Sequence, residues 1–190
     1  MTGRLVIAIA LAAAPVAFAP AAAAMADDTV MAPLFAQACG GATPTAEAIE
    51  ARMNADGAWR RLKDTDLAVE ALARVKPGVP SGPFKSPGPY KQWLRTVDGK
   101  EVRLLLATYE GRYKHLCALL VPDVANAMPY LDGFDDALKA MGLKGHNTDL
   151  PHFREYHGKL SDGRRAWGEI FSRSHVLLGP GHNMHMYVAF

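Results

Sequence analysis

The side chains best suited to hold a metal ion lie near the end of the chain, in His182-Asn183-Met184-His185-Met186. Imidazole and thioether groups suit copper, and imidazole also suits zinc. His182, His185 and Met184 are therefore candidate ligands, with His175 as a further one. If the segment is a strand, His182 and His185 point to opposite faces, because side chains alternate along a strand. The methionines would then fill gaps in a core. A copper or zinc site and ordinary packing both fit this segment.

A second group of polar side chains could perform acid–base chemistry: Asp149, His152, Arg154, Glu155 and His157. On a strand, only alternate members of this group would share a face. The stretch Ser172-Arg173-Ser174-His175 could supply a serine nucleophile and its base, but the Gly-x-Ser-x-Gly turn of many serine hydrolases is absent. The zincin, P-loop and dinucleotide-binding motifs are absent too. The sequence predicts no catalytic residue and leaves a hydrolase with dispersed histidines and carboxylates as an alternative.

Two further kinds of feature could contact a ligand or a partner. Four aromatic residues lie in predicted strands: Trp93, Tyr113, Trp167 and Tyr187. They could line a ligand patch, although aromatic side chains in strands usually pack in the core. The proline-rich segment 77–89 could dock another protein, or it could be a rigid connector. The glycine-rich segment 179–182 is the second expected interaction surface.

Cys39 and Cys117 are the two cysteines of the chain. In an oxidising compartment a lone pair of cysteines usually forms one disulfide. We therefore expect a bond that ties the N-terminal helical region to a central strand. A metal or catalytic thiol is the competing interpretation, because His115 has the same strand parity as Cys117, but a disulfide would consume the thiolate.

Residues 1–26 have the pattern of a secretory signal peptide. Arg4 is their one basic residue, residues 5–24 are apolar and rich in alanine, and Ala24-Met25-Ala26 matches the small-x-small cleavage pattern. Pro15 and Pro20 interrupt the apolar stretch, which disfavours a retained anchor helix. We expect cleavage near Ala26 and a periplasmic or secreted protein.

The remaining residues, 27–190, are enough for one domain with a real core. The chain has 21 Lys and Arg residues against 19 Asp and Glu residues, and the signal removes only Arg4. Such a balance argues against a nucleic-acid partner. No apolar stretch in 27–190 is long enough to span a bilayer. The expected partner is an unknown envelope protein or a small ligand, and the sequence requires no cofactor.

The centre of the fold is expected in a first meander, 90–121, with strands at 91–97, 102–108 and 113–121. Asp98-Gly99 and Glu110-Gly111 supply turn residues, and Asp-Gly favours a type I′ hairpin turn. Apolar residues of both parities in 102–108 indicate that both faces of the sheet are covered. A helical N-terminal part, 27–76, precedes the meander. It has helices at 30–38, 45–57 and 64–76, and Thr45 caps the second.

A further helix is predicted within 122–142. Pro129 fits its first turn, where the missing backbone N–H costs nothing. Leu131, Phe134, Leu138 and Met141 recur at helical spacing and define one apolar face.

A second meander, 150–190, is predicted to have strands at 153–160, 165–172 and 184–190. In the last strand Met184 and Val188 face one way and His185 and Tyr187 the other, which indicates a half-buried strand. Asp162-Gly163 occupies a turn equivalent to Asp98-Gly99, so a duplicated helix-plus-three-strand unit is our structural hypothesis. The sequence thus predicts a single α+β domain with a mostly antiparallel sheet of about six strands and helices on one face.

Short stretches spread over most of 27–190 carry a resemblance: Ala38-Cys39, Gly57-Ala58-Trp59, Cys117 with Pro122-Asp123, and Met141-Gly142-Leu143. They resemble a loosely defined set of exported alphaproteobacterial proteins that have no assigned activity. The chain departs from that set in the alanine that separates Gly57 from Trp59. The resemblance implies a secreted, disulfide-bonded domain and transfers no catalytic residue. We expect an exported, non-catalytic domain that binds a protein or a small ligand.

Overall fold

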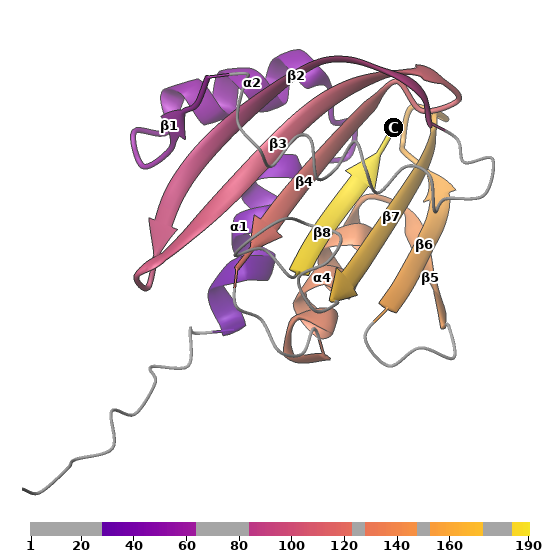
Figure 1. Cartoon of the computed structure of the whole chain (residues 1–190). Coiled ribbons are helices and arrows are strands. Elements are labelled where there is room, and N and C mark those ends of the chain that lie inside the picture. Colours follow the sequence, from indigo (N-terminus) through magenta and orange to yellow (C-terminus); the bar gives the residue numbers. More distant parts are fainter. Residues whose placement is uncertain (1–27, 64–83, 123–127, 148–152, 173–183) are drawn as a thin grey trace, which may run out of the picture.

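The computed structural model describes residues 28–63, 84–122, 128–147, 153–172 and 184–190. The described residues form one antiparallel sheet of eight strands with three helices packed against it, so the predicted α+β class is confirmed (Figure 1). The helices are α1 (Asp28–Cys39), α2 (Ala46–Ala55) and α4 (Met128–Ala140). The strands are β1 (Arg60–Arg61), β2 (Phe84–Val97), β3 (Lys100–Gly111), β4 (His115–Val121), β5 (Leu143–Asn147), β6 (Phe153–Lys159), β7 (Arg165–Ser172) and β8 (Met184–Ala189).

The strands follow the order β1-β2-β3-β4-β8-β7-β6-β5. Each half of this order is a four-stranded meander, and the two halves meet where β4 pairs with β8. The turn at Asp98-Gly99 joins β2 to β3, and the turn at Asp162-Gly163 joins β6 to β7, which are the corresponding strands of the two halves. This order agrees with the hypothesis of a duplicated unit, but each half has four strands rather than the three that were predicted. Asp98 and Gly99 have φ values of 48° and 77°, as a type I′ turn requires.

The sheet has eight strands rather than about six, because β1 and β5 were not predicted. β1 is only two residues long. β5 has the sequence Leu-Lys-Gly-His-Asn, in which glycine and polar residues weaken the strand signal. Both strands lie at the edges of the sheet, where short strands limit pairing with other chains.

Half of the proline-rich segment is a strand rather than a loop, so the prediction for 77–89 is wrong at 84–89. Pro87 pairs with Tyr109 of β3, and the register shifts on both sides of this pair. Among the described strands, β1 pairs with β2 only at Trp93 and Leu94. Residues 84–89 therefore have β3 as their one described neighbour, and the backbone N–H groups that prolines lack are not needed on the other side. Residues 77–83 lie outside the described residues, as do the signal segment 1–26 and the helix expected at 64–76.

Local signals correctly predict where α2 and α4 begin, although α2 ends at Ala55 rather than at residue 57. The Thr45 hydroxyl oxygen accepts a hydrogen bond from the backbone N–H of Ala48 and caps α2. Pro129 lies in the first turn of α4. The predicted apolar face of α4 is buried, with Phe134 and Leu138 fully enclosed. No helix in the described ranges is long and apolar enough to cross a bilayer.

The main core fills the space between the helices and the sheet. Phe134 of α4 packs against Phe35 of α1, with ring centroids 4.9 Å apart, and against Tyr156 of β6 at 5.4 Å. Gly133 permits this close approach, because a Cβ atom there would lie 2.6 Å from the Cβ of Ala32 on α1. Figure 1 shows α1 and α4 together on one side of the sheet.

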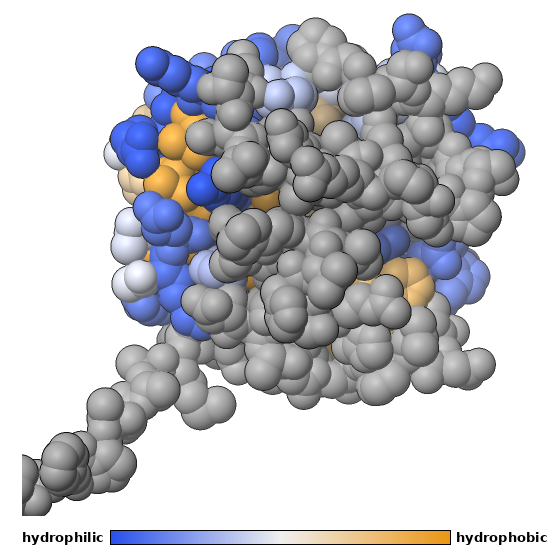
Figure 2. Space-filling model, viewed as in Figure 1, coloured by the Kyte–Doolittle hydropathy of each residue, from blue (hydrophilic) through white to orange (hydrophobic). Residues whose placement is uncertain are grey.

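The face of the sheet that points away from the helices carries a second buried cluster, so the prediction that the last strand is half-buried is wrong. The predicted alternation along β8 is present, but His185 and Tyr187 are only 2% and 7% exposed. The cluster consists of Leu105, Ala107, Tyr109, Tyr113, Leu116, Ala118, Trp167, Tyr187 and Ala189. Figure 2, seen from this side, shows a hydrophobic patch bordered by hydrophilic residues on the described surface at the left of the view.

The expected disulfide joins the two layers. Cys39 at the end of α1 is bonded to Cys117 in β4, with Cα atoms 5.6 Å apart. Both residues are fully buried in the main core. The bond therefore anchors the first helix to a central strand of the sheet.

Replacing both cysteines by alanine should lower the free energy of unfolding by about 4 kcal/mol, because the bond spans a sequence separation of 78 residues and restricts the unfolded chain. Equilibrium urea denaturation of the oxidised chain and of the Cys39→Ala/Cys117→Ala variant measures this difference. Wild type treated with reductant should unfold at the same urea concentration as the variant. An unchanged midpoint in the variant would contradict the stabilising role.

Candidate functional site

The structure separates the described members of the candidate metal site. Met184 lies in the main core on the helix-facing side of β8, whereas His185 lies on the opposite face. One ion cannot contact both side chains in this arrangement. His182 and His175 lie outside the described residues. Among the residues that the structure describes, no group of three or more His, Cys, Asp or Glu side chains could hold a metal ion.

Glu169 is the centre of a polar network that includes His185. The Glu169 carboxylate accepts a hydrogen bond from the Tyr187 hydroxyl at 2.6 Å, and its other oxygen lies 3.0 Å from Nε2 of His185. The three residues occupy one face of the sheet, since Glu169 pairs with Tyr187 across β7 and β8. Burial raises the pKa of Tyr187 well above its ordinary value, and the Glu169 carboxylate raises it further. Tyr187 therefore stays protonated and donates to Glu169.

Two members of the predicted acid–base group lie on the same face as this network. Nε2 of His157 is 3.2 Å from Oε1 of Glu155, and the His157 ring stacks on Trp167 at 6.2 Å. Arg154 has the opposite parity on β6 and belongs to the helix-facing side. Asp149 and His152 lie outside the described residues, and so does the His175 partner of Ser172. The described members of the acid–base group therefore lie on two faces of the sheet, as the alternation of side chains along a strand predicts.

The four candidate aromatic residues do not form one patch. Tyr113, Trp167 and Tyr187 belong to the second buried cluster, and Trp167 meets Tyr187 edge to face at 5.6 Å. Trp93 lies in the main core on the other face, where its indole N–H donates to the Asn54 side chain at 3.1 Å. These residues contribute packing on both sides of the sheet.

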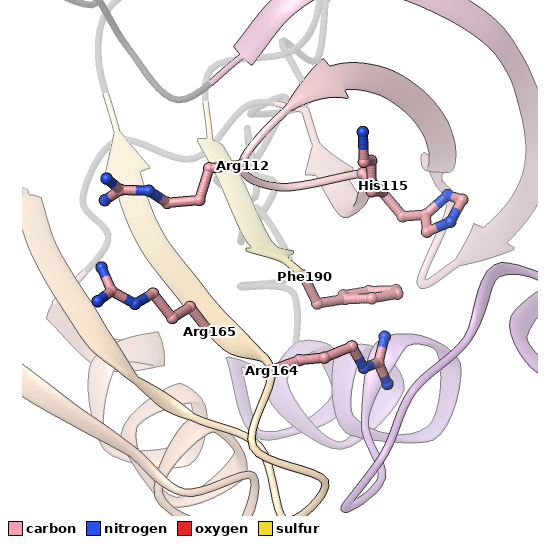
Figure 3. A pocket seen from close by; sticks show the side chains of 6 residues that line it. Arg112, His115, Arg164, Arg165 and Phe190 are labelled. Atoms are coloured by element: carbon pink, nitrogen blue, oxygen red, sulfur yellow. The ribbon is translucent and has the colours of Figure 1, made fainter.

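A pocket that was not predicted lies at one end of the sheet and is strongly basic. It has a volume of about 400 Å³. Its lining residues are Arg112, Lys114, His115, Arg164, Arg165 and Phe190, and we call it the basic pocket. In Figure 3 the Arg112 and Arg165 side chains extend in the same direction, and the Phe190 ring lies between His115 and Arg164.

The lining residues of the basic pocket come from three separate parts of the sequence. Arg112 and Lys114 belong to the turn between β3 and β4, and Arg164 and Arg165 lie where β7 begins. The β4–β8 pairing continues past the strand ends, because the backbone N–H groups of Lys114 and His115 both donate to the Phe190 carbonyl oxygen at 2.9 Å. The Phe190 N–H donates in turn to the His115 carbonyl oxygen at 3.0 Å. This pairing fixes the Phe190 ring beside the two turns.

The positive charge of the basic pocket is largely unneutralised. Arg164 is paired with Asp162 at 2.7 Å, donates to the Pro44 carbonyl oxygen, and lies over the Phe190 ring. Arg112, Lys114 and Arg165 are exposed and form no ion pair with any residue in the described ranges. A free carboxylate at Phe190 would still leave an excess of positive charge.

His115 contributes a neutral imidazole to this charged lining. Burial lowers its pKa, Arg164 and Lys114 lower it too, and only the Glu47 carboxylate opposes them. Nδ1 of His115 is buried and has no hydrogen-bond partner within the described part of the chain. At neutral pH the imidazole therefore adds no positive charge to the lining.

Comparisons with protein-family models, curated proteins and solved structures found no match to this chain. The functional conclusions therefore rest on the geometry above. Sequence reasoning missed Glu169 and the arginines of the basic pocket. The one available signal was a basic residue, Arg164, directly after the turn Asp162-Gly163.

Removing the Tyr187 hydroxyl should destabilise the fold, because it leaves the Glu169 carboxylate with one partner fewer in a buried setting. We expect Tyr187→Phe to cost about 1.5–3 kcal/mol, the range for hydrogen bonds to charged groups. Urea denaturation measures the cost. In a Glu169→Leu background the same change should cost clearly less, and equal costs in both backgrounds would show that the two residues do not interact.

Proposed function

We propose that this chain is an exported, non-catalytic protein that binds a small anionic ligand in the basic pocket. The observation that carries the proposal is the unneutralised charge of Arg112, Lys114 and Arg165 around a hollow with an aromatic wall. Arginine presents a planar fork of N–H donors that matches the oxygens of carboxylates and phosphates. A volume of about 400 Å³ suits a small molecule.

The wall of the basic pocket favours a ligand with an apolar or planar part beside its anionic group. The Phe190 ring lies 5.8 Å from the His115 ring, and the Arg164 guanidinium lies 5.6 Å from its centroid on another side. The ring is only 3% exposed, so it is held by its neighbours rather than free to move aside. The pocket thus combines fixed apolar contact with cationic groups, as ligand-binding sites usually do.

Export is supported by the Cys39–Cys117 disulfide, since such bonds persist in oxidising compartments. The signal-peptide pattern of residues 1–26 supports the same compartment. A binding role is favoured over catalysis because the described lining supplies cations, an imidazole and a ring but no nucleophile held by a base.

The basic pocket is tested by calorimetric titration of the oxidised chain with inorganic phosphate, sulfate and citrate at low salt. Arg112→Ala/Arg165→Ala should weaken binding of at least one of these anions by about tenfold or more, since two charge-assisted contacts are lost. The matched control is Arg60→Ala/Lys63→Ala, which removes two exposed cations outside the pocket and should bind like wild type. Absence of binding to wild type, or equal binding to both variants, would refute the proposal.

Anion binding should strengthen as the pH falls from about 7 to 5. His115 is neutral at pH 7 because its pKa lies below the ordinary value, and its protonation adds a positive charge to the lining. The carboxyls of Glu47 and Asp162 have lowered pKa values, so they stay ionised and do not cause the change. Sulfate keeps its charge over this range and is the suitable probe.

We expect sulfate affinity to rise about threefold in wild type, the effect of one partly exposed charge. In His115→Gln the affinity should be independent of pH. A rise of the same size in that variant would show that another group is responsible.

A further inference from the structure

A second hollow adjoins the basic pocket at His115 and differs from it in charge. It has a volume of about 190 Å³ and is lined by Ala46, Glu47, Glu50, Lys91, Leu106, Thr108 and His115. His115 lines both hollows, so its side chain borders each of them. We call this second hollow the acidic pocket, because two of its lining residues are glutamates.

Glu47 supplies the negative charge that is available to a ligand there. Glu50 is paired with Lys91 at 2.5 Å, so its charge is largely neutralised within the protein. Glu47 is exposed in the first turn of α2 and forms no ion pair with a residue that the structure describes. Hydrogen bonds from its own backbone N–H and from Thr45 lower its pKa, so it is ionised at neutral pH.

Cations therefore line one side of His115 and a carboxylate lies on the other. Both kinds of charge affect the pKa of His115: the Glu47 carboxylate raises it, and Arg164 and Lys114 lower it. A purely anionic ligand that filled both hollows would be repelled by Glu47, and a purely cationic one by Arg112 and Arg165. Opposite charges on the two ends of one ligand satisfy both hollows.

We propose that the ligand is a small zwitterion whose phosphate or carboxylate binds at Arg112, Lys114 and Arg165 and whose ammonium group binds at Glu47. This inference rests on the proposed function and adds the acidic pocket to it. His115, which lines both hollows, contacts the linker between the two charged groups. The neutral imidazole suits this position, since it does not repel the ammonium group.

The test compares two series of ligands that differ only in the ammonium group: ω-aminoalkyl phosphates and alkyl phosphates with two to six carbon atoms. Titrations at about pH 8 keep every phosphate fully ionised and every amine protonated. For at least one length, the aminoalkyl phosphate should bind wild type about three- to fivefold more tightly than its alkyl counterpart, the effect of one exposed ion pair.

The Glu47→Gln variant should lose this preference and bind alkyl phosphates like wild type. Glu101→Gln is the matched control, because Glu101 is an exposed glutamate on β3 that lines neither pocket, and it should keep the preference. Equal affinity for both series in wild type, or a preference that survives in Glu47→Gln, would overturn the zwitterion inference.

The outcomes separate this inference from the proposed function. If alkyl phosphates bind and lose affinity in Arg112→Ala/Arg165→Ala while no series shows a preference for the amine, only the zwitterion inference falls. If neither series binds wild type, the basic pocket is not a phosphate site and both proposals fall for this ligand class. Circular dichroism of each variant establishes that it retains the fold.

Discussion

The pairing of β4 with β8 is the interaction on which the rest of the structure depends. It runs from Leu116 opposite Ala189 to Val121 opposite Met184, and it is the junction between the two meanders. Neither strand has an exposed residue. Buried backbone groups are costly to leave unpaired, so the two central strands stabilise each other through both hydrogen bonding and burial. The continuation of this pairing to His115 and Phe190 builds the wall of the basic pocket.

The disulfide and the helices fix this junction from one side. Cys117 lies in β4, so its bond to Cys39 attaches α1 to the junction itself, and Phe35 and Phe134 hold α1 against α4. The opposite face carries the network around Glu169, whose partners His185 and Tyr187 both belong to β8. The central strand β8 thus packs against a hydrophobic core on one face and makes hydrogen bonds to Glu169 on the other. These hydrogen bonds satisfy polar atoms of His185 and Tyr187, which allows both side chains to be buried.

Short sequence patterns correctly predict the features of the fold that depend on only a few neighbouring residues. Thr45, the Asp98-Gly99 turn and the apolar stripe of α4 each act within a few residues, and the structure confirms them. β5 lacks apolar alternation, and the strand at 84–89 contains prolines, which are tolerated where no second described strand pairs with β2, so propensity predicted neither strand. Arg112 and Arg165 lie far apart in the chain and meet only through the register of β4, β8 and β7. The basic pocket is therefore non-local, and residue types alone directed attention to His182 and His185 near the end of the sequence instead.

Amide chemical-shift mapping tests most directly whether the β4–β8 junction builds an anion site. The oxidised, ¹⁵N-labelled chain would be titrated with inorganic phosphate. The largest and saturable shifts should occur at residues 112–115 and 164–165 and at Phe190, with smaller shifts at the edge strands. Saturable shifts centred on another part of the sheet, or none at phosphate concentrations in the millimolar range, would contradict the account.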